Sequence, residues 1–288
     1  MKLSVIIPSY NGAAVLRRSL DTWYRQTLPL DDYEVILVDN NSTDSTAEIA
    51  KEYQQYPNFR YVKELTPGAT QARHAGVKPA KSNILVFADN DGLFNSTCLQ
   101  AIWDMYEQDK KIAAVTGKIE LLWDREAPEW IAPYEFMLGK LNYGDEPRCG
   151  YDLYLNGGLF SIRKTVFEGV HGFNPDLVGR YLIGDGDTGL VNKLHNNNLL
   201  IAYTPDAVMQ HLQFVDVHGT EKGLGRHFFN TGITVSYGLF RKNKFSFSKE
   251  IAIYLVKNYL VYLKRRQNTC SIDRIKRNIF RICTRKGN

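Results

Sequence analysis

The sequence predicts an α/β fold in which a mainly parallel central sheet is flanked by helices. Over the first 120 residues, short β-branched or apolar runs alternate with longer segments of helical period, the pattern typical of βα units. Polar residues of similar character follow several of these runs. The 288 residues are 44% hydrophobic and 12% aromatic, enough for a sizeable core, which argues against a disordered or fibrous chain.

Five strands and at least two helices are expected in this part of the chain. The strands are predicted near Leu3 to Ile7, Glu34 to Val38, Phe59 to Val62, Asn83 to Ala88 and Ile112 to Thr116. Helices are predicted from about Ala13 to Arg25 and from about Ser45 to Tyr56, the second capped by Asp44 or Ser42. Further on, a strand near Ala207 to Gln210 and a helix near Thr188 to Asn196 are expected.

Polar loops follow three of the predicted strands. They are Pro8-Ser9-Tyr10-Asn11, Asp39-Asn40-Asn41-Ser42 and Asp89-Asn90-Asp91. In open parallel sheets, ligands bind beyond the carboxyl ends of the strands, where helix N-termini present free N–H groups. Three carboxylates are therefore expected to converge on one edge of the sheet.

The triplet Asp89-Asn90-Asp91 predicts a metal-diphosphate site. Residues two apart on an extended chain point the same way, so the two carboxylates share a face. They repel each other unless a cation lies near, and their hard oxygen ligands suit Mg²⁺ or Mn²⁺, which would in turn hold a diphosphate. The alternative is an ordinary strand-to-turn junction, where Asp and Asn are common.

Several linked motifs together resemble family 2 glycosyltransferases with the GT-A fold. The nucleotide-sugar half of that family is matched by Ser4 to Asn11, Val38 to Asp44, Pro67 to Gly76 and Asp89 to Asp91. Its acceptor-side strand and following G-G-F-[DN] turn are matched by Asn156 to Lys164 and Gly172-Phe173-Asn174. The resemblance covers roughly Lys2 to His211 and implies a smaller acceptor-side sheet beside the main one.

For the donor site, the resemblance implies a set of loop residues. Asp39 would hydrogen-bond the base or ribose of the nucleotide, and Arg73 would lie near the diphosphate. The remaining donor-binding positions are Pro8, Ser9, Tyr10, Asn11, Asn41, Asp89 and Asn90. The structural alternatives are a helix N-cap for Asp39 and a surface cation for Arg73.

The resemblance also implies a divalent cation, Mn²⁺ or Mg²⁺. Asp89 and Asp91 match the D-x-D pair, of which the second usually contacts the metal. His211 occupies the place where many family members carry a metal-binding histidine, with His218 and His227 as nearby alternatives. A histidine without a ligand role is the other interpretation.

Two acids compete for the role of general base. The family usually has Glu-Asp before a helix. The corresponding segment of this sequence is Gly184-Asp185-Gly186-Asp187-Thr188-Gly189-Leu190. Aligning the helix places Asp187 at the base position and Gly186 where Glu is expected. A shift of one residue would exchange the roles of Asp187 and Asp185, and an N-cap with its neighbour is the non-catalytic alternative.

Acceptor binding is expected from two kinds of residue. Trp123 and Trp130 could stack on the apolar face of a sugar, although large aromatic residues are more often core anchors. Asn156, Gly157 and Gly158 belong to the motif that resembles the acceptor side of the family.

The chain divides into three predicted regions. Residues 1–120 form the nucleotide-sugar-binding half, 121–240 the acceptor-binding half of the same domain, and 241–288 a basic helical C-terminal extension. Of the 36 basic and 31 acidic residues, 14 and two respectively follow Phe240, which gives the extension a formal charge of +12 and the rest −7. This tail is predicted to bind an anionic membrane surface, or to be a solvated helix face.

The same sequence argues against a membrane-spanning segment, nucleic-acid binding and secretion. The apolar run from Ile251 to Leu263 is too short to span a bilayer, and the acidic body with no recognition motif argues against nucleic acid. The first residues lack the pattern of a secretory signal, and the four scattered cysteines are expected to be free thiols. We expect a cytoplasmic protein, peripheral at the inner face of the plasma membrane.

The sequence therefore predicts an inverting glycosyltransferase that moves a sugar from a nucleotide diphosphate sugar to a hydroxyl of a glycan or lipid-linked acceptor. The main alternative is a non-catalytic glycan- or membrane-binding protein that retains the fold. A nucleotidyltransferase of the same fold would be expected to show a Gly-rich, basic N-terminal loop, which Pro8 to Gly12 is not.

Overall fold

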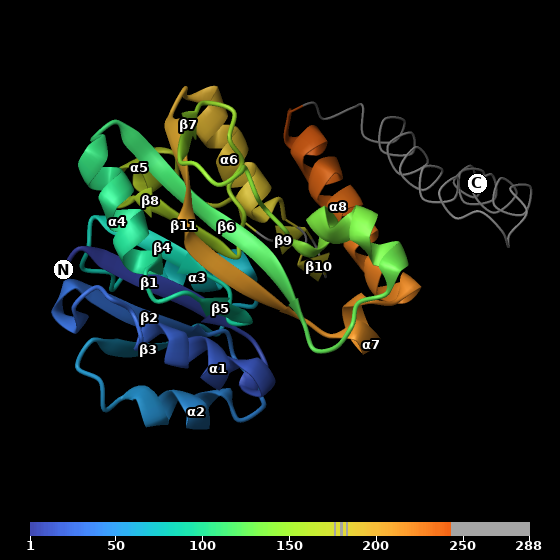
Figure 1. The fold of residues 1–288 in the computed structure, drawn as a ribbon, viewed down its shortest axis with the longest axis horizontal. Coiled ribbons are helices and arrows are strands. Elements are labelled where there is room, and N and C mark those ends of the chain that lie inside the picture. The colour runs from blue at the N-terminus through green and yellow to red at the C-terminus, as the bar shows by residue number, and fades with distance from the viewer. Residues whose placement is uncertain (176, 179–180, 183, 243–288) are drawn as a thin grey trace, which may run out of the picture.

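The computed structural model describes residues 1–175, 177–178, 181–182 and 184–242. One large sheet runs through the molecule, in the strand order β3-β2-β1-β4-β8-β6-β11-β5, with β7 paired to β11 (Figure 1). Two short strands, β9 and β10, form a second sheet. The strands are β1 (Leu3–Ser9), β2 (Tyr33–Asp39), β3 (Phe59–Lys63), β4 (Ile84–Ala88), β5 (Gly92–Phe94), β6 (Ile112–Trp123), β7 (Arg148–Gly150), β8 (Leu159–Arg163), β9 (Leu177–Val178), β10 (Tyr181–Leu182) and β11 (Leu200–Gln213).

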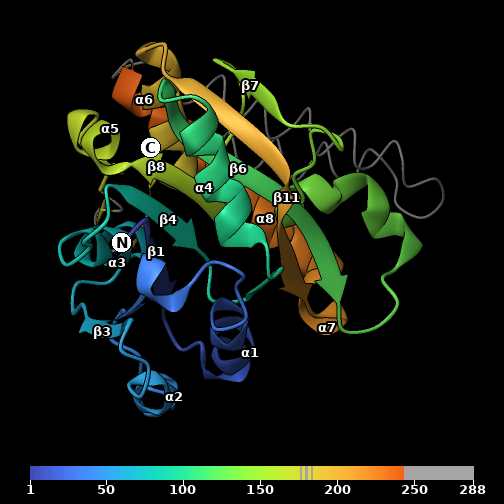
Figure 2. The same cartoon turned by 60° about the vertical axis from the view of Figure 1, so that its left-hand side comes forward.

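The strands of the N-terminal part pair in parallel, and the pairing beyond them is mixed. β3, β2, β1 and β4 are parallel neighbours, whereas β8 lies antiparallel between β4 and β6. β6 and β11 then run parallel, side by side along their length (Figure 2). The predicted α/β class with a parallel N-terminal sheet is confirmed.

Helices cover both faces of this sheet. The α-helices are α1 (Ala13–Trp23), α2 (Thr46–Tyr53), α3 (Ala69–Val77), α4 (Cys98–Gln108), α5 (Lys164–Gly169), α6 (Gly186–Asn196), α7 (Val215–His218) and α8 (Glu221–Lys242), and the 3₁₀ segments are η1 (Leu30–Asp32) and η2 (Glu129–Leu138). Apolar residues of α1, α2 and α4 pack in one core cluster, and those of α3, α5 and α6 in another.

Alternation along the buried strands produces these two cores. On β1, Val5 and Ile7 belong to the first cluster and Ile6 to the second, because successive side chains of a strand point to opposite faces. Strands buried on both faces are continuous apolar runs, as β4 is from Ile84 to Ala88. A third cluster joins η2 to α8 through Ile131 and Leu224.

The predicted element bounds hold closely except at β6 and at β11, because the strand predicted near Ala207 to Gln210 runs from Leu200 to Gln213. The run starting at Ile112 continues to Trp123, because β11 pairs with it as far as Gln213. A side chain at Gly117 would begin 2.3 Å from the backbone oxygen of Ala207, so glycine is needed where β11 shifts register. This non-local contact explains why the apolar pattern alone ended the strand too early.

The N-cap residue of the second helix is Ser45, not the predicted Asp44 or Ser42, and its side chain makes no capping hydrogen bond; the carboxylate of Asp44 instead binds the first N–H of the helix. Its Oδ1 accepts a hydrogen bond from the Thr46 backbone N–H at 3.0 Å, and its Oδ2 accepts one from the Ala13 N–H at 2.9 Å. One carboxylate thus serves the first turns of both α1 and α2, and these bonds lower the pKa of Asp44 against the opposing effect of burial.

The predicted three-region division stays a prediction. The main sheet is shared by the two proposed halves, since β8 and β6 pair with each other and β8 also pairs with β4. Residues 243–288 of the predicted basic extension lie outside the described residues. Among the helices that the structure describes, none is long and apolar enough to cross a membrane.

The contact of α3 with the sheet gives a stability prediction. A Cβ on Gly76 would lie 2.4 Å from Cγ2 of Ile6 and 3.0 Å from Cγ2 of Val38, both on buried strands. We expect Gly76→Ala to destabilise the protein by about 1–3 kcal/mol through overpacking, measured by urea unfolding. Gly225→Ala in α8 is the control, because no described atom outside its own helix backbone would lie within 4 Å of its Cβ, and it should not destabilise. Equal unfolding midpoints would contradict the tight contact.

Candidate active site

The carboxyl ends of β1 and β2 lie next to each other, and the polar loops predicted from the sequence follow them. Ser9 pairs with Asp39 at the last position of both strands. Asp39 is almost fully buried, and its Oδ1 accepts a hydrogen bond from the Ser42 N–H at 2.8 Å while its Oδ2 accepts one from the Tyr61 hydroxyl at 2.6 Å. Asp39 therefore shapes its own loop instead of capping α2.

The loops after β1 and β2 are joined by hydrogen bonds. Asn11 and Asn41 have φ values of +50° and +62°, a region that asparagine tolerates better than most residues. The Asn11 side chain accepts a hydrogen bond from the Thr43 N–H at 2.8 Å, and the Asn11 N–H donates to the Ser42 hydroxyl at 2.9 Å. The backbone of this predicted donor-binding region is thus fixed by the chain itself, while Tyr10 stays 64% exposed beside it.

Asn90 links the third polar loop to the first. Its side-chain amide donates to the Ser9 hydroxyl at 2.9 Å, and a Cβ on Gly12 would lie only 2.1 Å from the same amide nitrogen. The missing side chain at Gly12 leaves the room that Asn90 occupies. Pro8, within β1, lies beside Val38 of β2, so all the predicted donor-side loop residues gather at this edge of the sheet.

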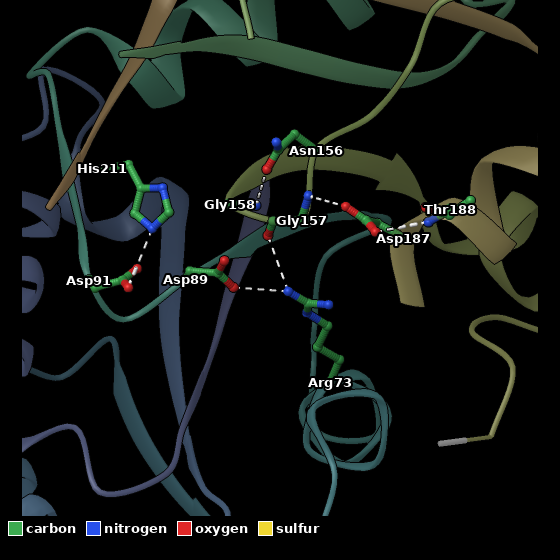
Figure 3. Close-up of polar contacts among 9 residues, drawn as sticks. All are labelled: Arg73, Asp89, Asp91, Asn156, Gly157, Gly158, Asp187, Thr188 and His211. Carbon is green, nitrogen blue, oxygen red and sulfur yellow. Dashed lines mark hydrogen bonds and ion pairs between the residues drawn. The ribbon is translucent and has the colours of Figure 1, made fainter. Parts of the chain in front are cut away.

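Arg73 and Asp89 form the ion pair of the site. Arg73 comes from α3 and is only 7% exposed, and its guanidinium donates to Asp89 Oδ1 at 2.9 Å and to the Gly157 carbonyl at 3.2 Å (Figure 3). The guanidinium carbon also lies 5.4 Å from the centre of the Phe173 ring. Burial raises the pKa of Asp89, the nearby Asp91 adds to this, and Arg73 opposes it.

Asp91 lies against His211 because β5 pairs with β11. His211 is opposite Gly92 in this antiparallel pair, and its Nε2 is 3.4 Å from Asp91 Oδ2 (Figure 3). Burial lowers the pKa of His211, but the hydrogen bond and charge of Asp91, with Asp89, outweigh burial and the pKa is raised overall. The other oxygen of Asp91, Oδ1, is buried and has no hydrogen-bond partner among the described residues.

That buried oxygen tests whether these residues fit a divalent cation. An unsatisfied buried carboxylate oxygen beside a second carboxylate and an imidazole is a donor set that Mn²⁺ or Mg²⁺ accepts. Within the described residues, no group of three or more His, Cys, Asp or Glu side chains is already arranged around one point. Asp91, Asp89 and His211 therefore fit a cation that takes its remaining ligands from a bound substrate.

Asp187 and Asp185 have different surroundings. Asp187, in the first turn of α6, accepts a hydrogen bond from the Gly157 N–H at 2.7 Å and from the Thr188 N–H at 2.8 Å (Figure 3). Asp185, at the N-cap of α6, is buried, and both its oxygens accept from the side-chain amide of Asn174. Asp187 is thus tied to the Gly157 turn, which Arg73 also contacts.

The predicted acceptor residues fall into two groups. Asn156, Gly157 and Gly158 form a turn beside the acids, in which the Gly158 carbonyl accepts from the Asp89 N–H at 3.2 Å. Trp123 packs against the η2/α8 cluster, and its buried indole N–H has no hydrogen-bond partner within the described part of the chain, whereas Trp130 on η2 is partly exposed. Neither tryptophan has a described contact with the acids, so their acceptor role stays a prediction.

The alternative histidines lie beyond His211. His218 and His227 have ring centres 6.1 Å apart, and His218 Nδ1 accepts a hydrogen bond from the Phe214 N–H at 3.2 Å. Burial lowers the pKa of both, and the charge of His211 contributes in the same direction. His211 alone of the three is placed against Asp91.

Two tyrosines of this region were not expected from the sequence. The Tyr61 hydroxyl binds the carboxylate of Asp39, and the Tyr154 hydroxyl binds Thr188 next to Asp187. Tyr61 could have been found, because it lies in the third predicted strand, which ends at the same edge as Asp39. No motif marks Tyr154, whose position depends on how α6 packs.

Comparison with known proteins identifies the family. A family model described as Glycosyl transferase family 2 matches residues 4–165, more than half of the chain. This chain belongs to glycosyl transferase family 2. The predicted resemblance is confirmed, and the matched segment contains the loops after β1, β2 and β4, together with Arg73 and the Gly157 turn.

Curated relatives of this family member are glycosyltransferases of several kinds. The poly(ribitol-phosphate) beta-glucosyltransferase of Bacillus spizizenii is 34% identical over 134 residues, which are 45% of this chain and 21% of the relative. A dolichyl N-acetyl-alpha-D-glucosaminyl phosphate 3-beta-D-2,3-diacetamido-2,3-dideoxy-beta-D-glucuronosyltransferase of Methanococcus voltae is 24% identical over 251 residues, 77% of this chain and 73% of the relative. In the first of these matches and in three others, the shared region spans only 21% to 36% of the relative.

Solved structures confirm the GT-A type of fold. TarS residues 1–349 of S. aureus superpose with a TM-score of 0.58 at 18% identity, over 88% of this chain and 74% of that chain. The mannosyltransferase PcManGT of Pyrobaculum calidifontis, solved with GDP-Man and Mn²⁺, gives 0.60 at 20% identity, over 82% of this chain and 62% of that one. At such identities the likeness shows the fold alone.

The Arg73–Asp89 pair predicts a pH-dependent loss of stability in this family member. Arg73→Met keeps an apolar stem over Phe173 but leaves Asp89 without its cation, so the pKa of Asp89, already raised by burial, should rise further. A raised acid pKa in the folded state means that stability falls as pH rises through that pKa. We expect a loss of about 1–2 kcal/mol at pH 7, limited by the 35% exposure of Asp89, and a smaller loss at pH 4.

Urea unfolding at both pH values measures this effect. Arg17→Met is the matched control, because Arg17 pairs with Glu52 on the surface and its loss should change stability little at either pH. A deficit for Arg73→Met that is equal at pH 4 and pH 7 would show that Asp89 does not depend on the guanidinium.

Proposed function

We propose that this chain is an inverting glycosyltransferase that moves a sugar from a nucleotide diphosphate sugar to a hydroxyl of a glycan or lipid-linked acceptor. The observation that carries the proposal is the meeting of four chain segments at the end of β4. Arg73, Asp89 and Asp187 all contact one another or the Gly157 turn, and Asp91 lies two residues from Asp89. A guanidinium, an acid paired with it and a second acid at one turn are the groups that such a transfer needs.

The names of the similar proteins support the donor class. Relatives are named for glucosyl, N-acetylglucosaminyl and glucuronosyl transfer, and neighbours were solved with UDP, UDP-GlcNAc and GDP-Man. The acceptors in the names, poly(ribitol-phosphate) and a dolichyl phosphate glycan, support a glycan or lipid-linked acceptor for this chain. Such products would place this enzyme in polysaccharide or cell envelope synthesis.

Asp187 is the proposed general base. Its Oδ2 is held by the Gly157 N–H and its Oδ1 by the Thr188 N–H, so the carboxylate is fixed in direction while each oxygen keeps a further lone pair. It takes the proton of the acceptor hydroxyl as that oxygen attacks the anomeric carbon and the bond to the diphosphate breaks. One displacement with no covalent enzyme intermediate inverts the configuration at that carbon.

Arg73 and a divalent cation are proposed to bind the leaving diphosphate. Arg73 is fixed by Asp89 and Gly157, which leaves its guanidinium at the edge where the loops after β1, β2 and β4 gather. Asp91, Asp89 and His211 would hold a divalent cation, Mn²⁺ or Mg²⁺, and such a cation would supply charge neutralisation to the departing diphosphate. Asp39 and its loop would bind the nucleoside, with Asn11, Asn41 and Asn90 fixing the backbone around it.

Donor binding is predicted to need the divalent cation. Nucleotide sugars that bind the folded protein should raise its melting temperature, so a panel with Mn²⁺ identifies the donor first. Asp91→Ala should then lower donor affinity in Mn²⁺ by at least about tenfold, because it removes the carboxylate with the unsatisfied buried oxygen, while the fold remains. Calorimetric titration measures the affinity. Asp216→Ala on exposed α7 serves as the control, and equal affinity in chelator and in Mn²⁺ would refute the metal proposal.

Loss of the base is predicted to slow transfer without weakening the donor. Asp187→Asn keeps the size and the bond to Gly157 but cannot take a proton, so kcat should fall by about 10² to 10⁴ while donor affinity stays within a few fold. Asp185→Asn should lower kcat only a few fold. Turnover of the donor found in the panel measures both variants. If Asp185→Asn lost turnover and Asp187→Asn kept it, the two acids would exchange roles.

A further inference from the structure

Asp185 is enclosed at the start of α6. Its side chain is 5% exposed, and Nδ2 of Asn174 donates to its two oxygens at 3.0 and 2.9 Å. Its backbone carbonyl accepts from the Gly189 N–H at 2.8 Å, the first hydrogen bond of the helix. Asp185 is therefore part of the N-terminal turn through both its backbone and its side chain.

Asn174 is itself fixed by the aromatic core. It follows Phe173, which is buried and packs edge-on against Phe87 of β4 and Phe160 of β8. Asn174 is 6% exposed, and among the residues that the structure describes, the Asp185 carboxylate is the acceptor that its Nδ2 reaches, so moving this carboxylate away would cost that buried amide its bond. The bond between Asn174 and Asp185 thus ties the start of α6 to the middle of the sheet.

Gly189 leaves the space that this carboxylate fills. A Cβ at Gly189 would lie 2.2 Å from Oδ1 and 2.3 Å from Cγ of Asp185, far closer than any real contact. The side chain of Asp185 therefore occupies the room where a side chain at position 189 would begin. Both oxygens face Asn174 and the helix, which is an arrangement suited to holding the backbone in place.

The opposite side of the same turn carries Asp187. Its Oδ2 accepts from the Gly157 N–H at 2.7 Å, so α6 is held at Asn174 by Asp185 and at Gly157 by Asp187. Releasing the first contact frees the turn to rotate, and the second contact then changes with it. A carboxylate displaced by about 1 Å loses much of its catalytic effect.

We propose that Asp185 is a positioning residue that, paired with Asn174, fixes the first turn of α6 and so directs the carboxylate of Asp187 toward the acceptor hydroxyl. The inference rests on the proposed function, in which Asp187 is the base. It assigns Asp185 no proton transfer. The positioning role requires one amide that faces one carboxylate. The two side chains should therefore be exchangeable between positions 174 and 185.

An exchange of the two side chains tests this directly. Asn174→Asp alone sets two carboxylates against each other and should lower kcat for the donor by about 10- to 100-fold, with KM for the donor within about twofold. Adding Asp185→Asn restores an amide–carboxylate pair, and the double variant should recover to within about threefold of wild type. If Asp185 were the base, the double variant would lack it, and its kcat would stay as low as that of any variant without its base.

A readout that needs no turnover separates this inference from the proposed function. In protein labelled with ¹⁵N-glycine, the amide of Gly157 reports its bond to Asp187; its signal is assigned with Gly157→Ala. The Gly157 signal should shift in Asn174→Asp and return in the double variant. If wild type turned over no nucleotide sugar while the signal behaved in this way, the proposed function would fail and the positioning of Asp187 would stand.

Two results would overturn the positioning role. One is a Gly157 signal that is unchanged in folded Asn174→Asp. The other is a double variant that melts like wild type yet turns over no faster than Asn174→Asp. If Asn174→Asp does not fold, Gly189→Ala replaces it, because its Cβ displaces the Asp185 carboxylate and should lower kcat similarly, whereas Gly225→Ala should not.

Discussion

The buried guanidinium of Arg73 is the constraint around which the site is arranged. A charge at 7% exposure is costly unless it is paired and hydrogen-bonded, and here Asp89, the Gly157 carbonyl and the Phe173 ring surround it. These partners come from the end of β4, the turn before β8 and the turn after α5. One cation therefore fixes the relative position of three segments that are far apart in the chain.

Insertion of β8 beside β4 makes this arrangement possible. β8 runs antiparallel to β4, so the Gly157 turn before β8 reaches the same end of the sheet as Asp89 after β4. Gly157 leaves room for these groups, because a Cβ there would approach both Arg73 and Asp187 to about 3 Å. The turn can then offer its carbonyl to the cation and its N–H to the carboxylate, which brings opposite charges to one peptide group from both sides.

Asp91 and His211 meet for a different reason. The short strand β5 crosses to pair with β11, and this pairing sets Gly92 opposite His211. A side chain at Gly92 would collide with Met209 and Phe94, so close packing of the two strands depends on glycine directly after the D-x-D triplet. The site thus has two parts, one built by α3, β4 and β8 and the other by β5 and β11, which meet at Asp89 and Asp91.

The sequence by itself determined most of the secondary elements of the N-terminal half, the α/β class, the family and the local placement of each polar loop. These follow from short-range patterns, such as apolar runs, strand ends and the two-residue spacing of Asp89 and Asp91. Only the tertiary structure gave β6 its full length, because β11 supplies its partner, and placed Trp123 in the η2/α8 cluster. It also separated the surroundings of Asp185 and Asp187, which are two residues apart on one loop. Their partners, Asn174 and Gly157, lie 11 and 30 residues away in the chain, and no local pattern encodes which acid faces which.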